Sequence, residues 1–297
     1  MKRIAEEVAA GHVLLADGAW GTMLQLRGLK AGECPEYWCV DRRDIVLEIA
    51  RSYVGVGCDI IETNSFGANR FKLSLFGLAD RAAELNRVAA AISREAAGPE
   101  RHVMGSVGPC GKLLLTGDVT EAELGEAFRE QVTALEAGGA DACCIETMSA
   151  VDEAAVAIRA AREHTRLEVF CSFTFQRMAD ARYRTMMGTA PGEAARAAVA
   201  AGAHGVGANC GQGMAQMAEI VREMRAAVPD RPIIVQANAG LPQRVGGVDV
   251  FPDTPELMAA HVPAVLAAGA NIVGGCCGTT PAHIAAIREV IRGRKSV

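Results

Sequence analysis

The chain is 297 residues long, half of its residues are hydrophobic, and its formal net charge is −5. This length suits one α/β barrel of roughly 250 residues or more, or two small domains. The negative charge and an aromatic content of 4% exclude an extended nucleic-acid surface, which needs basic patches and stacking side chains. We therefore expect small-molecule or protein partners and no nucleic acid.

The N-terminal segment lacks the features of a secretion signal. Glu6 and Glu7 fall where a signal peptide has its apolar run, and no stretch contains the ~18 consecutive apolar residues that span a bilayer. We expect a soluble, cytoplasmic protein with no membrane partner. In a reducing compartment the ten cysteines are expected to be metal ligands, nucleophiles or buried small residues, not a disulfide framework.

Short β-like runs alternate with helical patterns along the whole chain. The runs cover residues 13–16, 59–62, 103–107, 142–145, 168–173, 205–208, 233–236 and 271–274. Helical patterns with apolar residues three and four apart cover 122–137, 150–163, 192–201, 214–227 and 255–268. Several helices end in glycine before the next strand, as at Gly202 and Gly269. The repeated unit predicts a single (β/α)8 TIM barrel domain over residues 1–297.

Polar or reactive residues follow each predicted strand. They are Asp17, Glu62-Thr63-Asn64, Gly108-Pro109, Glu146-Thr147, Thr174, Asn209-Cys210, Asn238 and Cys276-Cys277. In this fold the carboxyl ends of the strands meet at one end of the barrel, where active sites are built. We therefore expect these residues to form one cluster.

Two glycine-flanked cysteine motifs point to a metal. Gly274-Gly275-Cys276-Cys277-Gly278-Thr279 follows the last predicted strand, and Gly207-Ala208-Asn209-Cys210 ends an earlier one. We predict that Cys210, Cys276 and Cys277 converge on one zinc ion at the C-terminal end of the strands. A zinc with three protein ligands keeps its fourth position open, as in catalytic sites.

The motif series resembles that of the homocysteine S-methyltransferase family along essentially the whole chain. It comprises Asp17-Gly18-Ala19-Trp20-Gly21-Thr22, Glu62-Thr63-Asn64-Ser65-Phe66, Gly108-Pro109-Cys110-Gly111, Asn238-Ala239-Gly240 and the two cysteine motifs. Within the family, Gly111-Lys112-Leu113-Leu114 and Ile145-Glu146-Thr147-Met148-Ser149 are most similar to the homocysteine-binding barrel of cobalamin-dependent methionine synthase. Cys110, where a hydroxyl residue is common, and Gln236-Ala237, where Pro often precedes the Asn-Ala-Gly turn, depart from the pattern.

The resemblance implies a zinc-dependent transfer of a methyl group to the sulfur of homocysteine, giving methionine. It makes Cys210, Cys276 and Cys277 the zinc ligands and, with Glu146, the catalytic residues. Asp17 and Glu146 would hold the ammonium group of the amino acid. The full set of expected substrate-binding residues is Asp17, Gly18, Ala19, Glu62, Thr63, Glu146, Asn209 and Asn238, with backbone N–H groups of Gly18 and Ala19 facing the substrate carboxylate.

Other assignments stay open at some of these positions. Glu62 is expected either to contact the substrate or to brace the end of the barrel. Asn238 is expected either to adopt a turn conformation or to fill the open zinc position without substrate. The remaining strand and loop cysteines are expected in the core: Cys34, Cys39, Cys58, Cys143, Cys144 and Cys171.

The chemistry leaves three hypotheses for function. A free alkyl thiol is largely protonated at neutral pH, and zinc would make it a nucleophilic thiolate. In the leading hypothesis the methyl donor is a methylated corrinoid on a separate protein, since the chain has no Asp-x-His-x-x-Gly corrinoid signature. The second uses S-methylmethionine, betaine or another small donor, or another acceptor thiol. The third is a non-catalytic zinc- or thiol-binding module.

Overall fold

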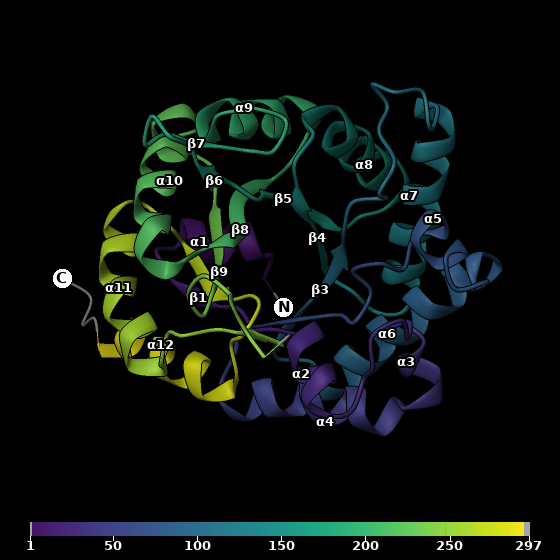
Figure 1. Ribbon diagram of the computed structural model, residues 1–297, viewed down its shortest axis with the longest axis horizontal. Helices are drawn as coiled ribbons and strands as arrows, with labels where there is room; N and C mark the ends of the chain where they lie inside the picture. The colour runs from purple at the N-terminus through teal and green to yellow at the C-terminus, as the bar shows by residue number, and fades with distance from the viewer. Residues whose placement is uncertain (1, 247, 294–297) are drawn as a thin grey trace.

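Eight parallel strands form one closed sheet at the centre of the molecule. The computed structural model describes residues 2–246 and 248–293. The strands are β1 (Leu14–Leu15), β2 (Ile60–Glu62), β3 (His102–Val107), β4 (Ala142–Met148), β5 (Glu168–Phe173), β8 (Gly205–Gly213), β9 (Ile233–Asn238) and β12 (Ile272–Gly275). They pair in the order β1-β12-β9-β8-β5-β4-β3-β2, and a parallel bridge between Ala16 and Ile60 joins the two ends (Figure 1).

One long helix follows each strand and packs outside the sheet. These helices are α4 (Arg43–Gly55), α6 (Ala82–Ala97), α7 (Glu121–Ala137), α8 (Val151–His164), α9 (Pro191–Ala201), α10 (Met214–Ala227), α11 (Pro255–Ala267) and α12 (Pro281–Gly293). Figure 1 shows them as a ring around the strands. The predicted (β/α)8 barrel is therefore confirmed. Within the described residues, no helix has the length and apolar character needed to cross a membrane.

Short helices and two hairpins extend the barrel at its ends. They are α1 (Ile4–Ala9), α2 (Gly21–Leu26), α3 (Trp38–Asp41), α5 (Arg70–Ser74), the 3-10 turn η1 (Ala79–Arg81), and the pairs β6 (Gln176–Arg177) with β7 (Tyr183–Arg184) and β10 (Gln243–Val245) with β11 (Val248–Val250). The sequence did not predict them, because helices of four to six residues and short hairpin strands without an apolar run have too little periodicity to be recognised.

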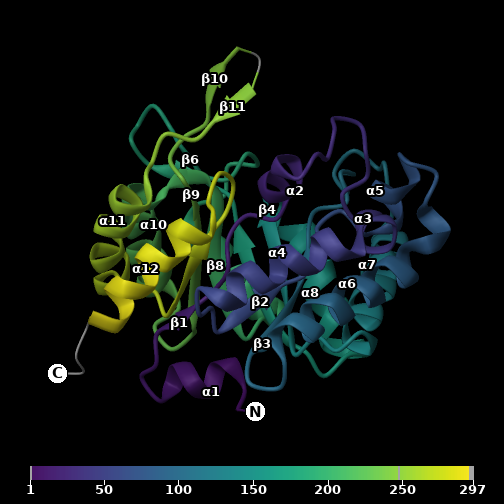
Figure 2. The ribbon, with the colours of Figure 1, turned by 90° about the horizontal axis from the view of Figure 1, so that it is seen from below.

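Helix α1 covers the end of the barrel at which the strands begin (Figure 2). Ile4 is fully buried and belongs to the apolar cluster inside the barrel. The Glu168 carboxylate accepts the backbone N–H of Ile4 at 2.6 Å and that of Ala5 at 3.0 Å. These bonds satisfy donors at the helix N-terminus, where a negative charge is also favoured.

Side chains inside the barrel change from apolar to polar along each strand. Ile60, Met104 and Cys144 belong to the interior apolar cluster, together with Ile234 and Ile272. Because successive side chains alternate between the faces of a strand, the next inward positions are two residues later. These positions hold Glu62, Ser106, Glu146, Gln236 and Gly274. The barrel interior is therefore packed with apolar side chains toward the N-terminal ends of the strands and forms a polar chamber toward their C-terminal ends.

The predicted core cysteines are buried as expected: Cys34, Cys39, Cys58, Cys143, Cys144 and Cys171. Cys144 faces the barrel interior, whereas Cys143 packs between the sheet and the helices.

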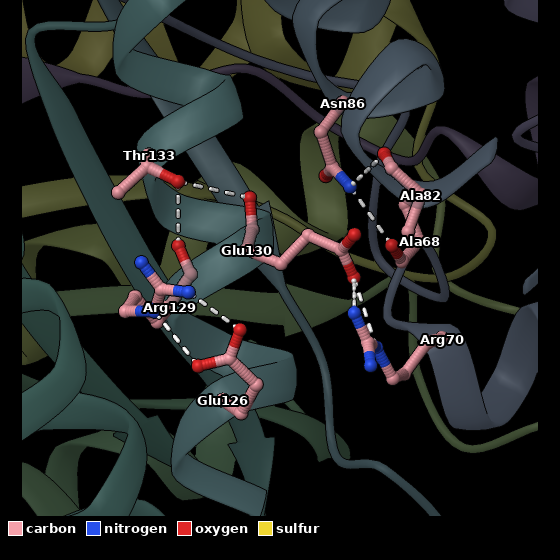
Figure 3. A network of polar contacts seen from close by, with 8 residues as sticks. All are labelled: Ala68, Arg70, Ala82, Asn86, Glu126, Arg129, Glu130 and Thr133. Atoms are coloured by element: carbon pink, nitrogen blue, oxygen red, sulfur yellow. Dashed lines mark hydrogen bonds and ion pairs between the residues drawn. The ribbon is translucent and has the colours of Figure 1, made fainter. Parts of the chain in front are cut away.

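Polar contacts hold the segment between β2 and α6 against its neighbours (Figure 3). Asn86 donates its amide to the carbonyls of Ala68 and Ala82, both at 2.8 Å. Arg70 pairs with Glu130 of α7 at 2.9 Å (Figure 3). Bonds of this kind fix the segment that carries residues 63–66, which form one wall of the site described next.

Candidate metal and substrate site

Three cysteine sulfurs meet at the C-terminal end of the strands. The sulfurs of Cys210, Cys276 and Cys277 all lie within 4.8 Å of one another, and those of Cys276 and Cys277 are 3.9 Å apart. A tetrahedral zinc with bonds of about 2.3 Å spaces its sulfur ligands by about 3.8 Å. The donor set and its spacing therefore fit zinc.

A local backbone distortion places Cys210 in this group. Cys210 has φ 55° and Gly211 has φ 62°, both in the left-handed region. The pairing of β8 with β9 shifts register between Asn209 and Gly213 at the same place. A left-handed conformation is costly for a residue with a side chain, and such strain concentrates at functional sites.

Hydrogen bonds from neighbouring strands fix the loop that carries the other two cysteines. The N–H of Cys276 donates to Ala237 at 2.7 Å, and Cys277 accepts from the N–H of Ala239 at 3.0 Å. At Gly278, with φ +79°, any side chain would meet the ring of Phe251 at 2.1 Å. Only glycine fits there, so this motif glycine is required by the geometry of the loop.

Thr279 links this loop to the segment after β1. Its hydroxyl donates to the carbonyl of Cys276 at 2.7 Å and accepts the N–H of Ala19 at 3.0 Å. Of the two N–H groups predicted to face a substrate carboxylate, that of Ala19 is therefore already used by the protein. The N–H of Gly18 has no partner among the described residues.

Asp17 and Glu62 form a buried acidic pair. Asp17 Oδ2 accepts from Trp20 Nε1 at 3.1 Å and from the N–H of Glu62 at 2.9 Å. Burial raises the pKa of Asp17 to about 7 and is opposed by these two bonds. The pKa of Glu62 is raised well above its ordinary value by burial, and then by the nearby charges of Glu146 and Asp17. Both acids hold a proton more tightly than exposed acids do.

Glu146 lies across the chamber and is held at both oxygens. Ser106 Oγ donates to Oε1, and Asn209 Nδ2 donates to Oε2 at 3.2 Å. Burial raises the pKa of Glu146 to about 7, against the effect of the Ser106 bond. Cys210 adds a further increase through its negative charge. In the cysteine cluster, hydrogen bonds from Cys276 and Cys277 lower the pKa of the Cys210 thiol.

The amide of Asn209 uses all of its hydrogen-bonding capacity within the protein. Its oxygen accepts from the N–H of Thr147 at 2.8 Å and from Ser172 Oγ at 2.7 Å. Its nitrogen donates to Glu146 and to Thr147 Oγ1, the latter at 2.7 Å. Thr147 also has a left-handed φ of 60°. Asn209 therefore holds Glu146 and Thr147 in place and has no group free for a substrate.

Asn238 is the last residue of β9 and pairs with Gly213, so it does not adopt the predicted turn conformation. That turn uses Gly240, at φ 82°. The Asn238 side chain hydrogen bonds to Cys210 and lowers the pKa of that thiol further. Asn238 Oδ1 has no partner among the described residues.

A cavity of about 370 Å³ opens beside the cysteines. Of the predicted residues, Gly18, Ala19, Glu62, Thr63, Glu146, Cys210, Cys276 and Cys277 line it. Asp17, Asn209 and Asn238 lie behind this lining. Thr147, expected in the cluster at the strand ends, also lines it, and so do Trp20, Phe66, Ser106 and Gln236, which were not among the expected site residues. Each lies either within one of the family motifs or two residues after an inward-facing strand residue, and these positions could have indicated that it lines the cavity.

Buried oxygen atoms without donors surround the same chamber. Eight buried side-chain atoms of the described chain lack a hydrogen-bond partner. Four of them are oxygens on Asp17, Glu62, Gln236 and Asn238. Buried polar atoms are almost always paired, so a group of such atoms around one cavity marks a place for a ligand or ordered water. A cation with several N–H donors, such as an ammonium, is the complement of four acceptors.

Comparison with known proteins identifies relatives over nearly the whole chain. Residues 14–291 match the family model described as homocysteine S-methyltransferase. Methionine synthase of Mycobacterium tuberculosis (strain ATCC 25618 / H37Rv) is 33% identical over 317 residues, which cover 98% of this chain and 26% of the relative. Methionine synthase of Mycobacterium leprae (strain TN) is 32% identical over 306 residues, covering 96% of this chain and 24% of the relative. The chain thus spans about a quarter of the length of these curated relatives.

Solved structures give the same assignment. The metallated form of the homocysteine methyltransferase MmuM from Escherichia coli superimposes with a TM-score of 0.76 and 25% identity, over 93% of this chain and 95% of that one. Its apo form gives a TM-score of 0.71 at 24% identity, which supports the fold alone. The extent of the family match is decisive: the chain belongs to the homocysteine S-methyltransferase family, as its motif series predicts.

Proposed function

We propose that this chain transfers a methyl group to the sulfur of homocysteine and so forms methionine. The observation that carries the proposal is the convergence of three cysteine sulfurs on a cavity lined or backed by buried acids, two of which keep one oxygen without a partner. Sulfur ligands suit zinc, and carboxylates suit an ammonium group. An amino acid that ends in a thiol matches both features at once.

Cys210, Cys276 and Cys277 are the residues that would hold zinc. Bound there, zinc would lower the pKa of a thiol and keep it a nucleophilic thiolate at neutral pH. The chain contributes by holding the three sulfurs together through the left-handed turn at Cys210 and the hydrogen bonds around Cys276 and Cys277. This preorganisation reduces the ordering cost of binding.

The acids would bind the ammonium group of the substrate. Glu62 and Glu146 line the cavity, and Asp17 lies directly behind it with one free oxygen. A cation among them would favour their ionised forms and oppose both causes that raise the pKa of Glu62, its burial and the repulsion from Glu146 and Asp17. The free N–H of Gly18 is suited to the substrate carboxylate. Held at both charged groups, the amino acid presents its sulfur toward the cysteines.

In the transfer itself, a lone pair of the homocysteine sulfur forms the new S–C bond. The methyl group leaves its carrier without the bonding electron pair, which stays on the carrier, and the thiol proton passes to solvent. We propose a methylated corrinoid on a separate protein as this carrier, which agrees with the similarity to methionine synthases.

A second candidate donor is a small onium compound such as S-methylmethionine or betaine. Trp20 and Phe66 line the cavity, and aromatic faces attract sulfonium and quaternary ammonium groups. The similarity to MmuM, a homocysteine methyltransferase of which 95% is covered, also permits a barrel that acts without a carrier domain.

The test is methionine formation from homocysteine by the zinc-loaded protein with four donors in parallel. These donors are free methylcobalamin, a methylated corrinoid protein, S-methylmethionine and betaine. Turnover with the cobalt-bound methyl group alone supports the proposal, and turnover with an onium compound alone supports the second candidate. A protein that binds homocysteine but produces no methionine with any donor would contradict both.

A further inference from the structure

The large exposed apolar side chains of the described residues all belong to segments that lead from a barrel strand to the next outer helix. There are thirteen: Leu26, Val40, Phe66, Leu75, Phe76, Leu113, Leu115, Met178, Met186, Met187, Leu241, Val250 and Leu257. Each stands between the end of a barrel strand and the first turn of the outer helix that follows it. In a (β/α)8 barrel these strand-to-helix segments surround the end at which the active site opens.

Single exposed apolar residues are normal on any protein surface, but this distribution is one-sided. Large apolar groups that gather on one face of a molecule mark an interaction surface. The cavity lies at the same end, since Phe66 both lines it and is 40% exposed. Whatever covers these residues would therefore also face the mouth of the cavity.

The segment 174–190 supplies three of these thirteen side chains, as many as residues 66–76 and residues 241–257 each supply. It contains the β6–β7 hairpin and exposes Met178, Met186 and Met187, the second of them at 77%. Methionine is flexible and polarizable, and such side chains adapt to a partner's surface. Figure 2 shows β6 near the end of the molecule opposite α1, below the projecting β10–β11 hairpin.

The charge of this end differs from that of the rest of the protein. The strand-to-helix segments 16–42, 63–81, 108–120, 149–150, 174–190, 211–213, 239–254 and 276–280 contain eleven Lys and Arg against nine Asp and Glu. Two of those acids, Asp17 and Glu36, are buried. The remainder of the chain has nineteen basic against 26 acidic residues. Arg177, Arg182 and Arg184 of segment 174–190 make no ion pair among the described residues, so their charge is available to a partner.

We propose that this end of the barrel is the docking surface for a separate acidic protein that carries the methyl donor, with segment 174–190 as its main contact. The proposal rests on the proposed function, because docking here brings the carried methyl group to the mouth of the cavity. A second copy of the chain fits less well, since it would bring the unpaired arginines of two segments 174–190 together and close both cavities. A lipid surface would likewise cover the mouth and exclude the donor.

The experiment compares two donors in methionine formation by the zinc-loaded protein: a purified methylated corrinoid protein, and free methylcobalamin, which needs no docking. The triple variant Met178→Ser, Met186→Ser, Met187→Ser should lower kcat/KM for the protein donor by about tenfold or more. With free methylcobalamin its rate should equal that of the wild type. Thermal unfolding of the variant should match the wild type, because the three side chains are exposed.

Charge reversal provides the second arm. The double variant Arg177→Glu, Arg182→Glu should lower kcat/KM for the protein donor by about tenfold at low salt, and the difference should shrink at roughly 0.5 M NaCl because salt screens the attraction. The matched control is Arg166→Glu, whose side chain is 96% exposed in the turn between α8 and β5, at the opposite end. It should leave both donors unaffected.

Several results would overturn the docking surface. One is an equal loss of rate with both donors, and another is no loss with either. A wild type that uses the protein donor no faster than free methylcobalamin would overturn docking while leaving the proposed function intact. No methionine from any donor would overturn both. A dimer in sedimentation that the methionine variant dissociates, or co-sedimentation with phosphatidylserine vesicles, would assign the surface to a second copy or to lipid instead.

Discussion

The two ends of the barrel are built from the same strands, but they differ in whether the hydrogen-bonding capacity of their acids is satisfied by the protein. At the end covered by α1, the Glu168 carboxylate accepts two backbone N–H groups, and Asp59 accepts the N–H of Leu15 at 2.8 Å. At the other end, acids such as Glu62 retain oxygens without donors, and Thr147 and Cys210 adopt left-handed conformations. The first end stabilises the fold, and the second holds groups that only a ligand can satisfy.

The largest effect is expected from a substitution that removes one of the three cysteine ligands. Cys276→Ser should abolish zinc retention while leaving a folded barrel, because one of three soft sulfur ligands is lost and the barrel core does not depend on the metal. Zinc per protein is measured by atomic absorption after dialysis. Cys143→Ala is the matched control, since Cys143 packs between sheet and helices. Full zinc occupancy in Cys276→Ser would remove it from the cluster.

The next effect is a pH dependence of the free energy of unfolding, which comes from Asp17 at the C-terminal end of the strands. Because the pKa of Asp17 is raised to about 7, the unfolded chain loses this proton near pH 4 while the folded chain keeps it. Rising pH therefore favours unfolding of the metal-free, substrate-free protein across this window, by at most about 4 kcal/mol from this group. Below about pH 4 this destabilising contribution disappears, since Asp17 is protonated in both the folded and the unfolded chain.

Asp17→Asn isolates this contribution, because an amide oxygen can still accept from Trp20 and Glu62. Urea unfolding at pH 5 and pH 8 should show a smaller loss of stability for the variant than for the wild type. The variant should also bind homocysteine more weakly. Parallel pH profiles for the two proteins would show that Asp17 does not titrate in this window.

A smaller effect compares one acid from each end. Glu146→Gln should weaken homocysteine binding by about 100-fold, or about 2.7 kcal/mol, because a charged partner of the ammonium is lost. Zinc content should not change. Glu168→Gln should instead lower the free energy of unfolding by about 1 to 2 kcal/mol and leave homocysteine affinity unaltered. Calorimetric titration and urea unfolding check both, and equal losses of affinity would contradict the division between the ends.

The smallest effect concerns positioning by Asn209. Asn209→Asp keeps the shape and the oxygen that accepts from Thr147 and Ser172, but it replaces the donor facing Glu146 with an acceptor. We expect about tenfold weaker homocysteine binding with zinc retained. Ser172→Ala removes one donor to Asn209 and should change affinity less than about twofold. If Asn209→Asp binds homocysteine as the wild type does, Asn209 has no positioning role.

Much of this arrangement could be predicted from the sequence. The eight β-like runs all become barrel strands, because alternation of apolar runs and amphipathic helices has few other solutions. The cysteine motifs could be grouped because the strand ends of a barrel converge, which brings the Cys210 sulfur to within 4.8 Å of the sulfurs of Cys276 and Cys277. The membership in the family was likewise readable from motifs spread along the chain.

The finer features depend on register and local distortion. β4 and β8 extend past their predicted ends through irregular pairing at Thr147 and Cys210. This shift turns Asn209 toward Glu146 and engages its amide fully, so a residue expected to bind substrate is occupied by the protein. Residue order alone does not reveal such bonds. Nor did it indicate that Thr279 uses the N–H of Ala19 or that the exposed apolar side chains gather at one end.

We propose that the three cysteines and the buried acids form one site for an amino acid with a thiol. The most direct test is zinc K-edge absorption of the zinc-loaded protein before and after addition of homocysteine. We expect three sulfur neighbours at about 2.3 Å that become four when homocysteine binds, and no such change in Glu146→Gln at the same low homocysteine concentration. A sulfur count that stays at three at saturating homocysteine would contradict the account.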